Sequence, residues 1–295
     1  MAQRREFGIA AALTTPFAGG SIDVERLCRH AIGSLDRGCD RIALFGTTGE
    51  GPSIGFGERR PVLEALKARG VSGAKLTFGI TASAIDDALA EARLAYEFGI
   101  PSLLVTPPYY YKDVSPSAVS DWFAHFIGAL PEGGPDVILY NIPQVTGVTI
   151  PADVVAALKA QFPDRIVGVK DSCGDWASAE RLLTRFPDLA ILIGDERLLE
   201  RAAKLGAAGS ISGVANFRPD LLNAIMAGAP ADAALAPLVD AIVRIPTTPA
   251  VKALVAHVTG EAAWRTVRPP LSALSDAEAA GLTAVYDRLL TRMVA

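Results

Sequence analysis

Eight short apolar segments, each followed by a stretch with helical periodicity, are the feature that most constrains the fold of this chain. They are rich in Ile, Leu, Val and Ala and span residues 8–13, 40–45, 75–80, 102–106, 136–140, 165–171, 190–193 and 209–212. Strands that are apolar along their whole length are typical of parallel sheets covered by helices on both faces. The pattern therefore predicts an α/β protein in which strands and helices alternate.

The number of repeats favours a closed (β/α)8 TIM barrel over an open, doubly wound sheet. Eight units fit within 295 residues, a length at which barrels commonly form one domain. A doubly wound sheet would need a glycine-rich phosphate-binding turn after the first strand, where this chain has Thr14-Thr15-Pro16-Phe17. We predict a catalytic barrel over residues 1–225 and a C-terminal helical appendage over 226–295, which by analogy serves subunit contact.

Composition and charge exclude several classes of function. The net charge is −4, with acidic and basic residues interspersed, which argues against a nucleic-acid partner. The three histidines and three cysteines show no metal-ligand spacing and no CxxC pair, so no metal site is expected. The chain also lacks a signal peptide and an apolar run of membrane-spanning length, which predicts a soluble, cytoplasmic protein without a membrane partner.

Polar side chains follow four predicted strands at the edge where a barrel carries its active site. Thr47 and Thr48 follow the second strand, Tyr110 follows the fourth, Tyr140 ends the fifth and Lys170 ends the sixth. Each has an ordinary structural interpretation when taken alone, such as a tight turn, a packed aromatic ring or a lysine extended towards water. Their combination at one mouth of the barrel favours Schiff-base chemistry.

The residue types suggest a division of labour. Desolvation disfavours the charged form of a lysine at the end of a buried strand, and a neutral amine can attack a ketone to form an imine. A phenol held near that lysine can transfer protons, and Tyr140 comes from the adjacent strand. Thr47 can pass a proton between phenols, and the backbone N–H groups of the 46–49 turn can hold a carboxylate. No arginine is expected at this mouth.

Three segments resemble the signatures of the dihydrodipicolinate synthase/N-acetylneuraminate lyase superfamily, which consists of pyruvate-dependent class I aldolases. They are Gly46-Thr47-Thr48-Gly49-Glu50, Tyr140-Asn141-Ile142-Pro143 and Gly168-Val169-Lys170-Asp171. The resemblance covers essentially the whole chain, including Leu13-Thr14-Thr15-Pro16-Phe17 at the start. It implies a (β/α)8 barrel, no metal or organic cofactor, and a homotetramer built of two tight dimers.

The resemblance also implies roles for the polar residues. Lys170 would form the imine with pyruvate or another 2-oxo acid, and Tyr140 would be the acid/base. Thr47 and Tyr110 would complete a hydroxyl relay, with Tyr110 reaching in from a neighbouring subunit. Whether Tyr109 or Tyr110 makes that crossing stays open, because this loop differs in length from the loop of the synthases.

The substrate side of the pocket departs from the synthase pattern. By resemblance, Thr47 and Thr48 would hold the pyruvate carboxylate and Ile211 would line the pocket. Dihydrodipicolinate synthases typically carry an arginine after the Tyr-Asn-x-Pro signature, where it binds the carboxylate of the aldehyde partner, and here that place is taken by Val145. A valine cannot replace a bidentate, charge-assisted contact.

Other segments, over residues 49–53, 108–111 and 268–270, look more like 2-keto-3-deoxygluconate aldolases. N-acetylneuraminate lyases usually have Gly-Ser-Thr-Gly-Glu, where this chain has Thr47. Archaeal aldolases that accept phosphorylated substrates carry an arginine where this chain has Asp113. We therefore expect an aldolase that reversibly cleaves an unphosphorylated 2-keto-3-deoxy sugar acid to pyruvate and an aldehyde.

Three alternatives stay open. A 4-hydroxy-tetrahydrodipicolinate (dihydrodipicolinate) synthase would condense pyruvate with aspartate semialdehyde. A dehydratase of keto-deoxy sugar acids would use the same imine. A non-catalytic barrel would bind a 2-oxo acid as a sensor, and the intact set of Lys170, Tyr140 and Thr47 argues against it.

Overall fold

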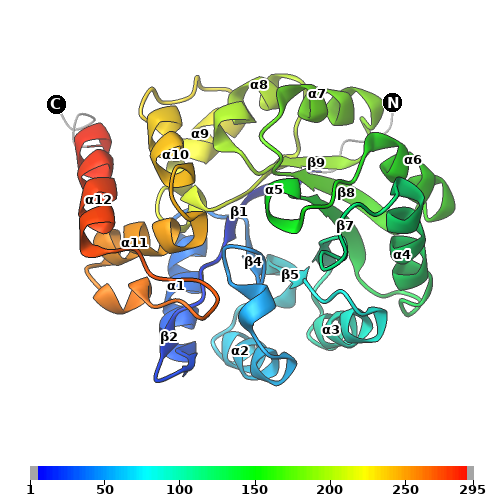
Figure 1. The fold of residues 1–295 in the computed structure, drawn as a ribbon, viewed down its shortest axis with the longest axis horizontal. Helices are drawn as coiled ribbons and strands as arrows, with labels where there is room; N and C mark the ends of the chain where they lie inside the picture. Colours follow the sequence, from blue (N-terminus) through cyan, green and yellow to red (C-terminus); the bar gives the residue numbers. More distant parts are fainter. Residues whose placement is uncertain (1–5, 291–295) are drawn as a thin grey trace.

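The computed structural model describes residues 6–290 and shows eight parallel strands closed into a barrel (Figure 1). The strands are β1 (Gly8–Ala12), β4 (Arg41–Leu44), β5 (Leu76–Ile80), β6 (Ser102–Val105), β7 (Asp136–Asn141), β8 (Ile166–Asp171), β9 (Ala190–Ile193) and β10 (Gly209–Ser212). Closure comes from β1, which pairs with β4 on one side and β10 on the other. The predicted TIM barrel is confirmed, and the open, doubly wound sheet is excluded.

Helices surround the strands in the order expected of this fold (Figure 1). Those of the barrel are α1 (Val24–Asp36), α2 (Phe56–Ala68), α3 (Ile85–Glu97), α4 (Pro116–Gly128), α6 (Ala152–Gln161), α7 (Trp176–Arg185), α8 (Leu199–Lys204) and α9 (Pro219–Met226). Local signals set several boundaries. Asp23 and Ser115 accept backbone N–H bonds as N-caps, and Gly99 follows α3 with a φ of 66°.

Two short elements have no counterpart in the sequence prediction. A two-stranded antiparallel hairpin, β2 (Phe17–Ala18) and β3 (Ser21–Ile22), follows β1. A single helical turn, α5 (Pro143–Thr146), follows β7 and places Val145 beside the barrel mouth. Both are too short to produce a periodic apolar pattern, since each has four residues or fewer.

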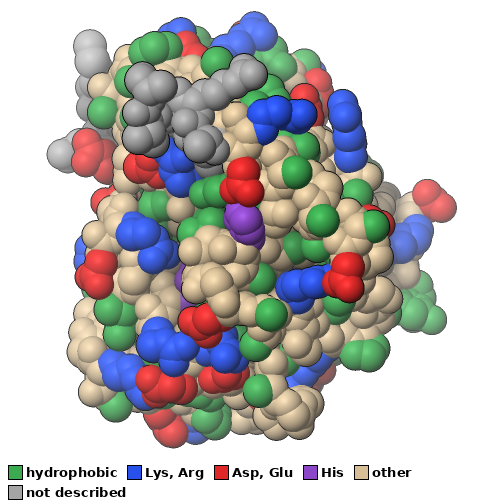
Figure 2. Space-filling view, turned by 90° about the vertical axis from the view of Figure 1, so that its left-hand side faces the viewer, with side chains coloured by type: hydrophobic (Ala, Val, Ile, Leu, Met, Phe, Trp, Pro, Cys, Tyr) green, Lys and Arg blue, Asp and Glu red, His purple; other side chains and the backbone are tan. Residues whose placement is uncertain are grey.

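The C-terminal helices α10 (Leu235–Val243), α11 (Thr247–Thr259) and α12 (Asp276–Leu290) pack together on one side of the barrel (Figure 1). The face on this side carries acidic and basic side chains interspersed (Figure 2). Helix α11 is buried along most of its length, from Thr248 to Ala256. The division at residue 225 into barrel and appendage stays a prediction. Within residues 6–290, no helix is long and apolar enough to cross a membrane.

The core has an outer layer between strands and helices and an inner layer inside the barrel. The inner layer is built largely of small and medium side chains, including Ala10, Ala43 and Ile138. On β8 the pairing with β7 shifts by one residue, so that Ile138 pairs with Gly168. A Cβ on Gly168 would lie 2.5 Å from the carbonyl oxygen of Ala190, which explains the glycine. Beyond this bulge, Val169 packs in the outer layer and Lys170 lines the cavity at the mouth.

Candidate active site

A cavity of about 310 Å³ opens at the C-terminal ends of the strands. This is the end at which barrel enzymes carry their active sites. Six of the seven predicted site residues line it: Thr47, Thr48, Tyr140, Val145, Lys170 and Ile211. The seventh, Tyr110, does not.

Lys170 and Tyr140 form the floor of the cavity. They are direct cross-strand partners in the β7–β8 ladder, and both are buried, with 5% and 3% of their surface exposed. The Lys170 Nζ lies 4.2 Å from the centroid of the Tyr140 ring. Strand pairing therefore fixes an amine directly beside a phenol in a site largely closed to water.

The hydroxyl of Thr47, in the turn after β4, lies beside the Tyr140 hydroxyl. The Oγ1 atom of Thr47 lies 3.4 Å from the hydroxyl oxygen of Tyr140, within reach of a hydrogen bond in which either oxygen can donate. A bond of this length can tighten when a substrate fills the site. The pair provides a route for a proton to and from the tyrosine.

The turn that carries Thr47 is held in an unusual backbone conformation. Phe45 and Glu50, at its two ends, have φ values of 58° and 57°, a region that costs a residue other than glycine about 1–3 kcal/mol. Within the described part of the chain, no group accepts a hydrogen bond from the backbone N–H of Thr47 or Thr48. Free N–H groups at adjacent positions of a turn form an anion-binding concavity.

The tyrosine loop does not enter the cavity of its own chain. Tyr110 is 77% exposed, and its ring packs edge-to-face against that of Tyr111 with centroids 5.2 Å apart. Lys112 ties the loop to α5 by donating to the carbonyl of Thr146 at 2.8 Å. Asp113 is also exposed and lies outside the cavity lining. Within one chain, its carboxylate is therefore not placed to repel the phosphate of a bound substrate.

An arginine lies at the mouth, against the sequence expectation. Arg197 follows β9 and lines the cavity, with its guanidinium bound to both carboxylate oxygens of Asp195 at 2.9 and 2.6 Å and to Asp240 at 2.7 Å. The hydrogen bonds that Arg197 donates to Asp195 are the main reason that the pKa of Arg197 is raised. Two carboxylates therefore surround one guanidinium.

Glu196, beside this arginine, is a buried acid in the cavity wall. It accepts a hydrogen bond from the hydroxyl of Ser212 and one from the backbone N–H of Val214 at 3.5 Å. Burial raises the pKa of its carboxyl above the ordinary value. Together with the aspartates on Arg197, it gives this wall an acidic character.

Comparison with known proteins identifies the family. The model of the dihydrodipicolinate synthetase family matches residues 6–288. The chain belongs to this family. It is therefore a lyase of the dihydrodipicolinate synthase/N-acetylneuraminate lyase superfamily, as the sequence motifs indicate.

Three relatives illustrate the range of the family. A crystal structure of dihydrodipicolinate synthase from Agrobacterium tumefaciens str. C58 is 42% identical with a TM-score of 0.94, covering 97% of this chain and 100% of that one. An "uncharacterized DapA-like lyase" of Chloroflexus aurantiacus is 36% identical, over 96% of this chain and 97% of the relative. A structure described as KD(P)GA from T. tenax is 25% identical with a TM-score of 0.83, covering 97% and 100%.

The C-terminal segment supplies part of the cavity in this family member. Val239 and Ile242 of α10 and Thr247, Thr248 and Val251 of α11 line it. The sequence prediction placed these residues in an appendage and gave them no role in the site. Their local pattern is that of an ordinary amphipathic helix, and only tertiary packing brings them to the mouth.

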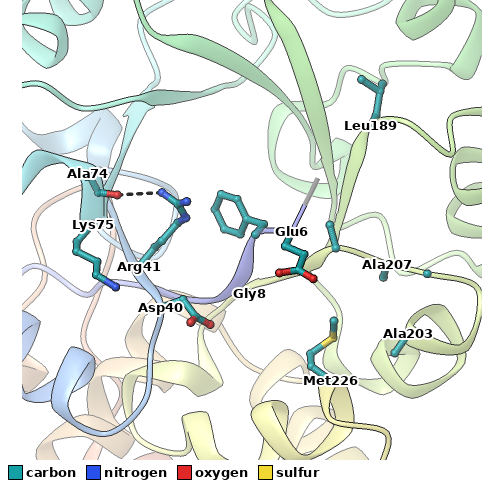
Figure 3. Close-up of a pocket in the computed structure, with 13 residues that line it drawn as sticks. Glu6, Gly8, Asp40, Arg41, Ala74, Lys75, Leu189, Ala203, Ala207 and Met226 are labelled. Atoms are coloured by element: carbon teal, nitrogen blue, oxygen red, sulfur yellow. Dashed lines mark hydrogen bonds between the residues drawn. The ribbon is translucent and has the colours of Figure 1, made fainter. Parts of the chain in front are cut away.

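A second, larger cavity lies at the opposite mouth of the barrel (Figure 3). Its volume is about 590 Å³, and charged residues of both signs line it, among them Asp40, Arg41 and Lys75. Arg41 donates to the carbonyl of Ala74 at 3.0 Å, and Asp40 accepts from the N–H of Ile9 at 2.8 Å. None of the predicted site residues lies here.

Proposed function

We propose that this lyase forms a Schiff base between Lys170 and the keto carbon of a 2-oxo acid, and that it reversibly cleaves a 2-keto-3-deoxy sugar acid to pyruvate and an aldehyde. The observation that carries the Schiff base is the buried Lys170 amine, 4.2 Å from the Tyr140 ring. The hydroxyl of that ring is 3.4 Å from Thr47. The arrangement joins a nucleophile, a proton carrier and a relay.

The proposed chemistry assigns each group one task. The Lys170 Nζ attacks the C2 carbonyl and water leaves, which gives an imine. The Tyr140 oxygen takes the proton of the C4 hydroxyl, the C3–C4 bond breaks, and its electron pair flows into the imine to form an enamine as the aldehyde departs. Tyr140 then returns a proton to C3, and water releases pyruvate. The N–H groups of Thr47 and Thr48 hold the carboxylate throughout.

Lys170 is favoured as the nucleophile over the other buried lysine. Within residues 6–290, Lys170 and Lys252 are the two lysines with buried side chains. Burial lowers the pKa of Lys252, but this residue does not line the cavity, and its ammonium donates to Thr15 and Glu50. Of these two lysines, Lys170 is the one that lines the cavity.

The charge of the cavity supports a neutral aldehyde as the second product. Among the described residues that line it, Lys170 and Arg197 carry the only cationic side chains, and Arg197 is engaged by two aspartates. Val145, 57% exposed at the mouth, offers an apolar surface. An anionic aldehyde would meet the acidic wall around Glu196 without a free cation, whereas hydroxyl groups can donate to these carboxylates.

A second candidate is 4-hydroxy-tetrahydrodipicolinate synthase, which would condense pyruvate with aspartate semialdehyde. It is favoured by the 42% identity to a structure described as dihydrodipicolinate synthase. Comparing kcat/KM for a panel of 2-keto-3-deoxy acids with kcat/KM for pyruvate plus the semialdehyde separates the candidates. Pyruvate release from the keto-deoxy acids also distinguishes cleavage from dehydration.

The Schiff base itself is tested by trapping. Pyruvate and borohydride should attach a covalent adduct to Lys170, which intact-mass measurement and peptide mapping would locate. Lys170→Ala should give no adduct while circular dichroism shows a folded protein. An adduct on Lys252, or none with the wild-type protein, contradicts the proposal.

We further propose a cytoplasmic homotetramer in which Tyr110 reaches the site of a neighbouring subunit. Support comes from the two tyrosines Tyr110 and Tyr111, which are both more than two-thirds exposed on one loop. Native mass measurement would give the number of subunits. Mixing Tyr110→Phe chains with Lys170→Ala chains would then show whether each site needs residues from two chains.

A further inference from the structure

A buried ion pair outside the cavity holds the turn over residues 46–51. Lys252, on α11, and Glu50, in the turn, have fully buried side chains, and the Lys252 Nζ lies 2.5 Å from Glu50 Oε1. The same ammonium donates to the carbonyl of Thr15 at 2.8 Å, and the second Glu50 oxygen accepts from the backbone N–H of Arg268 at 2.9 Å. Two distant segments therefore bind Glu50 directly, and the segment at Thr15 binds the same ammonium.

Stability alone is a weak reason for such a pair. Burying a lysine and a carboxylate removes the hydration of both. Apolar residues of similar volume at the same positions often stabilise a fold equally or more. Burial lowers the pKa of Lys252, and the Glu50 carboxylate opposes that shift. What the pair supplies is geometry, because a carboxylate bound through both oxygens fixes Glu50 in its left-handed conformation, with φ at 57°.

Helix α11 holds the turn at a second point. Thr248 Oγ1 donates to the carbonyl of Thr47 at 3.3 Å. Thr248 and Lys252 are four residues apart and so lie on the same face of the helix. The helix thus contacts the turn on both sides of Thr48, and Val251 of the same helix lines the cavity.

We infer that Glu50 and Lys252 are positioning residues that hold the N–H groups of Thr47 and Thr48 where the substrate carboxylate binds. The inference rests on the proposed function, because it takes this turn as the carboxylate site. Neither residue lines the cavity, so neither touches the substrate. Loss of the pair should weaken binding of every 2-oxo acid and leave the imine chemistry at Lys170 intact at saturation.

Glu50→Gln and Glu261→Gln make a matched comparison. Glu261, which follows α11, has its carboxylate paired with Arg26 of α1 at 2.7 Å, and among the described residues it binds neither the turn over residues 46–51 nor the cavity lining. Both changes replace a paired carboxylate with an amide of the same shape. Trapping by borohydride is measured against pyruvate concentration for wild type and both variants, with thermal unfolding recorded alongside.

For Glu50→Gln we expect the half-saturating pyruvate concentration to rise at least tenfold, with complete modification of Lys170 at saturation. For Glu261→Gln we expect a value within twofold of wild type despite a lower melting temperature. Equal shifts in the two variants, or no shift in Glu50→Gln, overturn the positioning role. If wild type traps no pyruvate on Lys170, the proposed function fails and the inference fails with it.

If Glu50→Gln does not fold, Thr248→Val carries the test. It removes the hydroxyl that binds the Thr47 carbonyl and keeps the side-chain size. Its control is Thr259→Val, which removes a hydroxyl bound to the carbonyl of Val255 at the far end of the same helix. Thr248→Val should raise the half-saturating concentration at least threefold, and the same value for both variants contradicts the inference.

Discussion

The two mouths of the barrel differ in a way that cavity size does not reveal. The N-terminal mouth has the larger cavity, about 590 Å³ against about 310 Å³, and more exposed charge. Its side chains bind backbone groups at the strand starts, as Asp40 binds the N–H of Ile9. At the C-terminal mouth, Lys170, Tyr140 and Thr47 converge on one another instead.

This difference teaches that the convergence of reactive groups, and not the volume of the cavity, indicates which mouth of the barrel carries the candidate active site. Parallel strands bring their C-terminal ends to one rim, so residues far apart in sequence meet there. The N-terminal rim of such barrels serves stability. Substitutions should therefore affect turnover at one mouth and unfolding at the other.

Removing the Tyr140 hydroxyl tests the comparison most severely. Tyr140→Phe keeps the ring against Lys170 and loses the proton carrier, so turnover should fall about 10²–10⁴-fold. The half-saturating pyruvate concentration in the trapping assay should change little, because the carboxylate site is intact. Tyr96→Phe, at an exposed position on α3, is the control. A fall of less than about tenfold would show that another group moves the proton.

Acid should destabilise the fold through His30, which lies on α1 outside both cavity linings. Its buried imidazole has a pKa lowered from 6.5 to about 4, mainly by desolvation. Asn216 Oδ1 already accepts from the N–H of Thr14, so His30 Nε2 donates to that oxygen in the neutral state. Because the folded state disfavours the proton, this stability is complete above pH 6.5 and is lost as pH falls through about 4.

The expected loss of unfolding free energy is roughly 3 kcal/mol, at about 1.4 kcal/mol per pKa unit. Denaturant unfolding between pH 8 and 4 measures it. His30→Gln keeps a side-chain N–H donor and cannot titrate in this range, so its stability should vary less with pH. An identical pH profile for the two proteins would assign the acid loss to other groups.

A change at the rim of the C-terminal mouth should alter selectivity and leave the chemistry in place. Val145→Arg offers a carboxylate two N–H donors, a contact worth about 1.5–3 kcal/mol. The ratio of kcat/KM for aspartate semialdehyde to that for keto-deoxy sugar acids should rise about tenfold or more. Val258→Arg is similarly exposed on α11 and lies outside the cavity lining, so it serves as the control.

Two results would change this interpretation of the rim. A wild-type enzyme that already prefers the semialdehyde strongly would overturn the substrate proposal whatever the variant does. An unchanged ratio in a folded, pyruvate-binding variant would show that Val145 does not face the aldehyde.

The smallest effect is expected at the N-terminal mouth. Asp40→Ala removes the acceptor for the N–H of Ile9, a loss of about 1 kcal/mol that should lower the melting temperature by about 2–4 °C. Turnover per folded molecule should stay within twofold of wild type. Lys75→Ala removes an exposed ammonium that has no hydrogen-bond or ion-pair partner among the described residues, and it should change neither quantity. A large loss of turnover in Asp40→Ala would contradict the conclusion that the N-terminal mouth serves stability and not catalysis.

The barrel could be predicted from sequence because its strands are buried on both sides and therefore apolar throughout. Each predicted strand segment matches the observed strand within one residue at each end, and β8 includes both Lys170 and Asp171. The apolar pattern of α10 extends back to Ala231, but the helix begins at Leu235, because residues 233 and 234 form a turn whose alanines resemble the helical pattern. Short elements such as α5 contain too few residues to show a periodic pattern of apolar side chains.

Reasoning from residue types and chain order predicted the site only where its residues sit on strand ends or in the turn after β4; Val145, on α5, and Ile211 came from the family resemblance. Lys170, Tyr140 and Thr47 follow from chain order alone, since parallel strands place them at one rim. Arg197 was missed because the Gly-Asp-Glu segment before it has the composition of an ordinary turn. Thr248 was missed because nothing local shows that α11 packs against residues 46–51. Tyr110 is exposed, and its assignment to the site needs a second chain.

The division of the cavity between strand ends and helices has an evolutionary consequence. The groups proposed for chemistry belong to β7, β8 and the turn after β4, whereas much of the remaining wall comes from α5, α10 and α11. Mutations in those helices can change the accepted aldehyde while inherited chemistry is preserved. Family members can therefore acquire different substrates through changes in these helices. Their shared motifs will then indicate common ancestry more reliably than they indicate the substrate. A combinatorial library at Val145, Val239 and Ile242 should therefore be an efficient way to obtain variants that form or break a carbon–carbon bond with a different aldehyde.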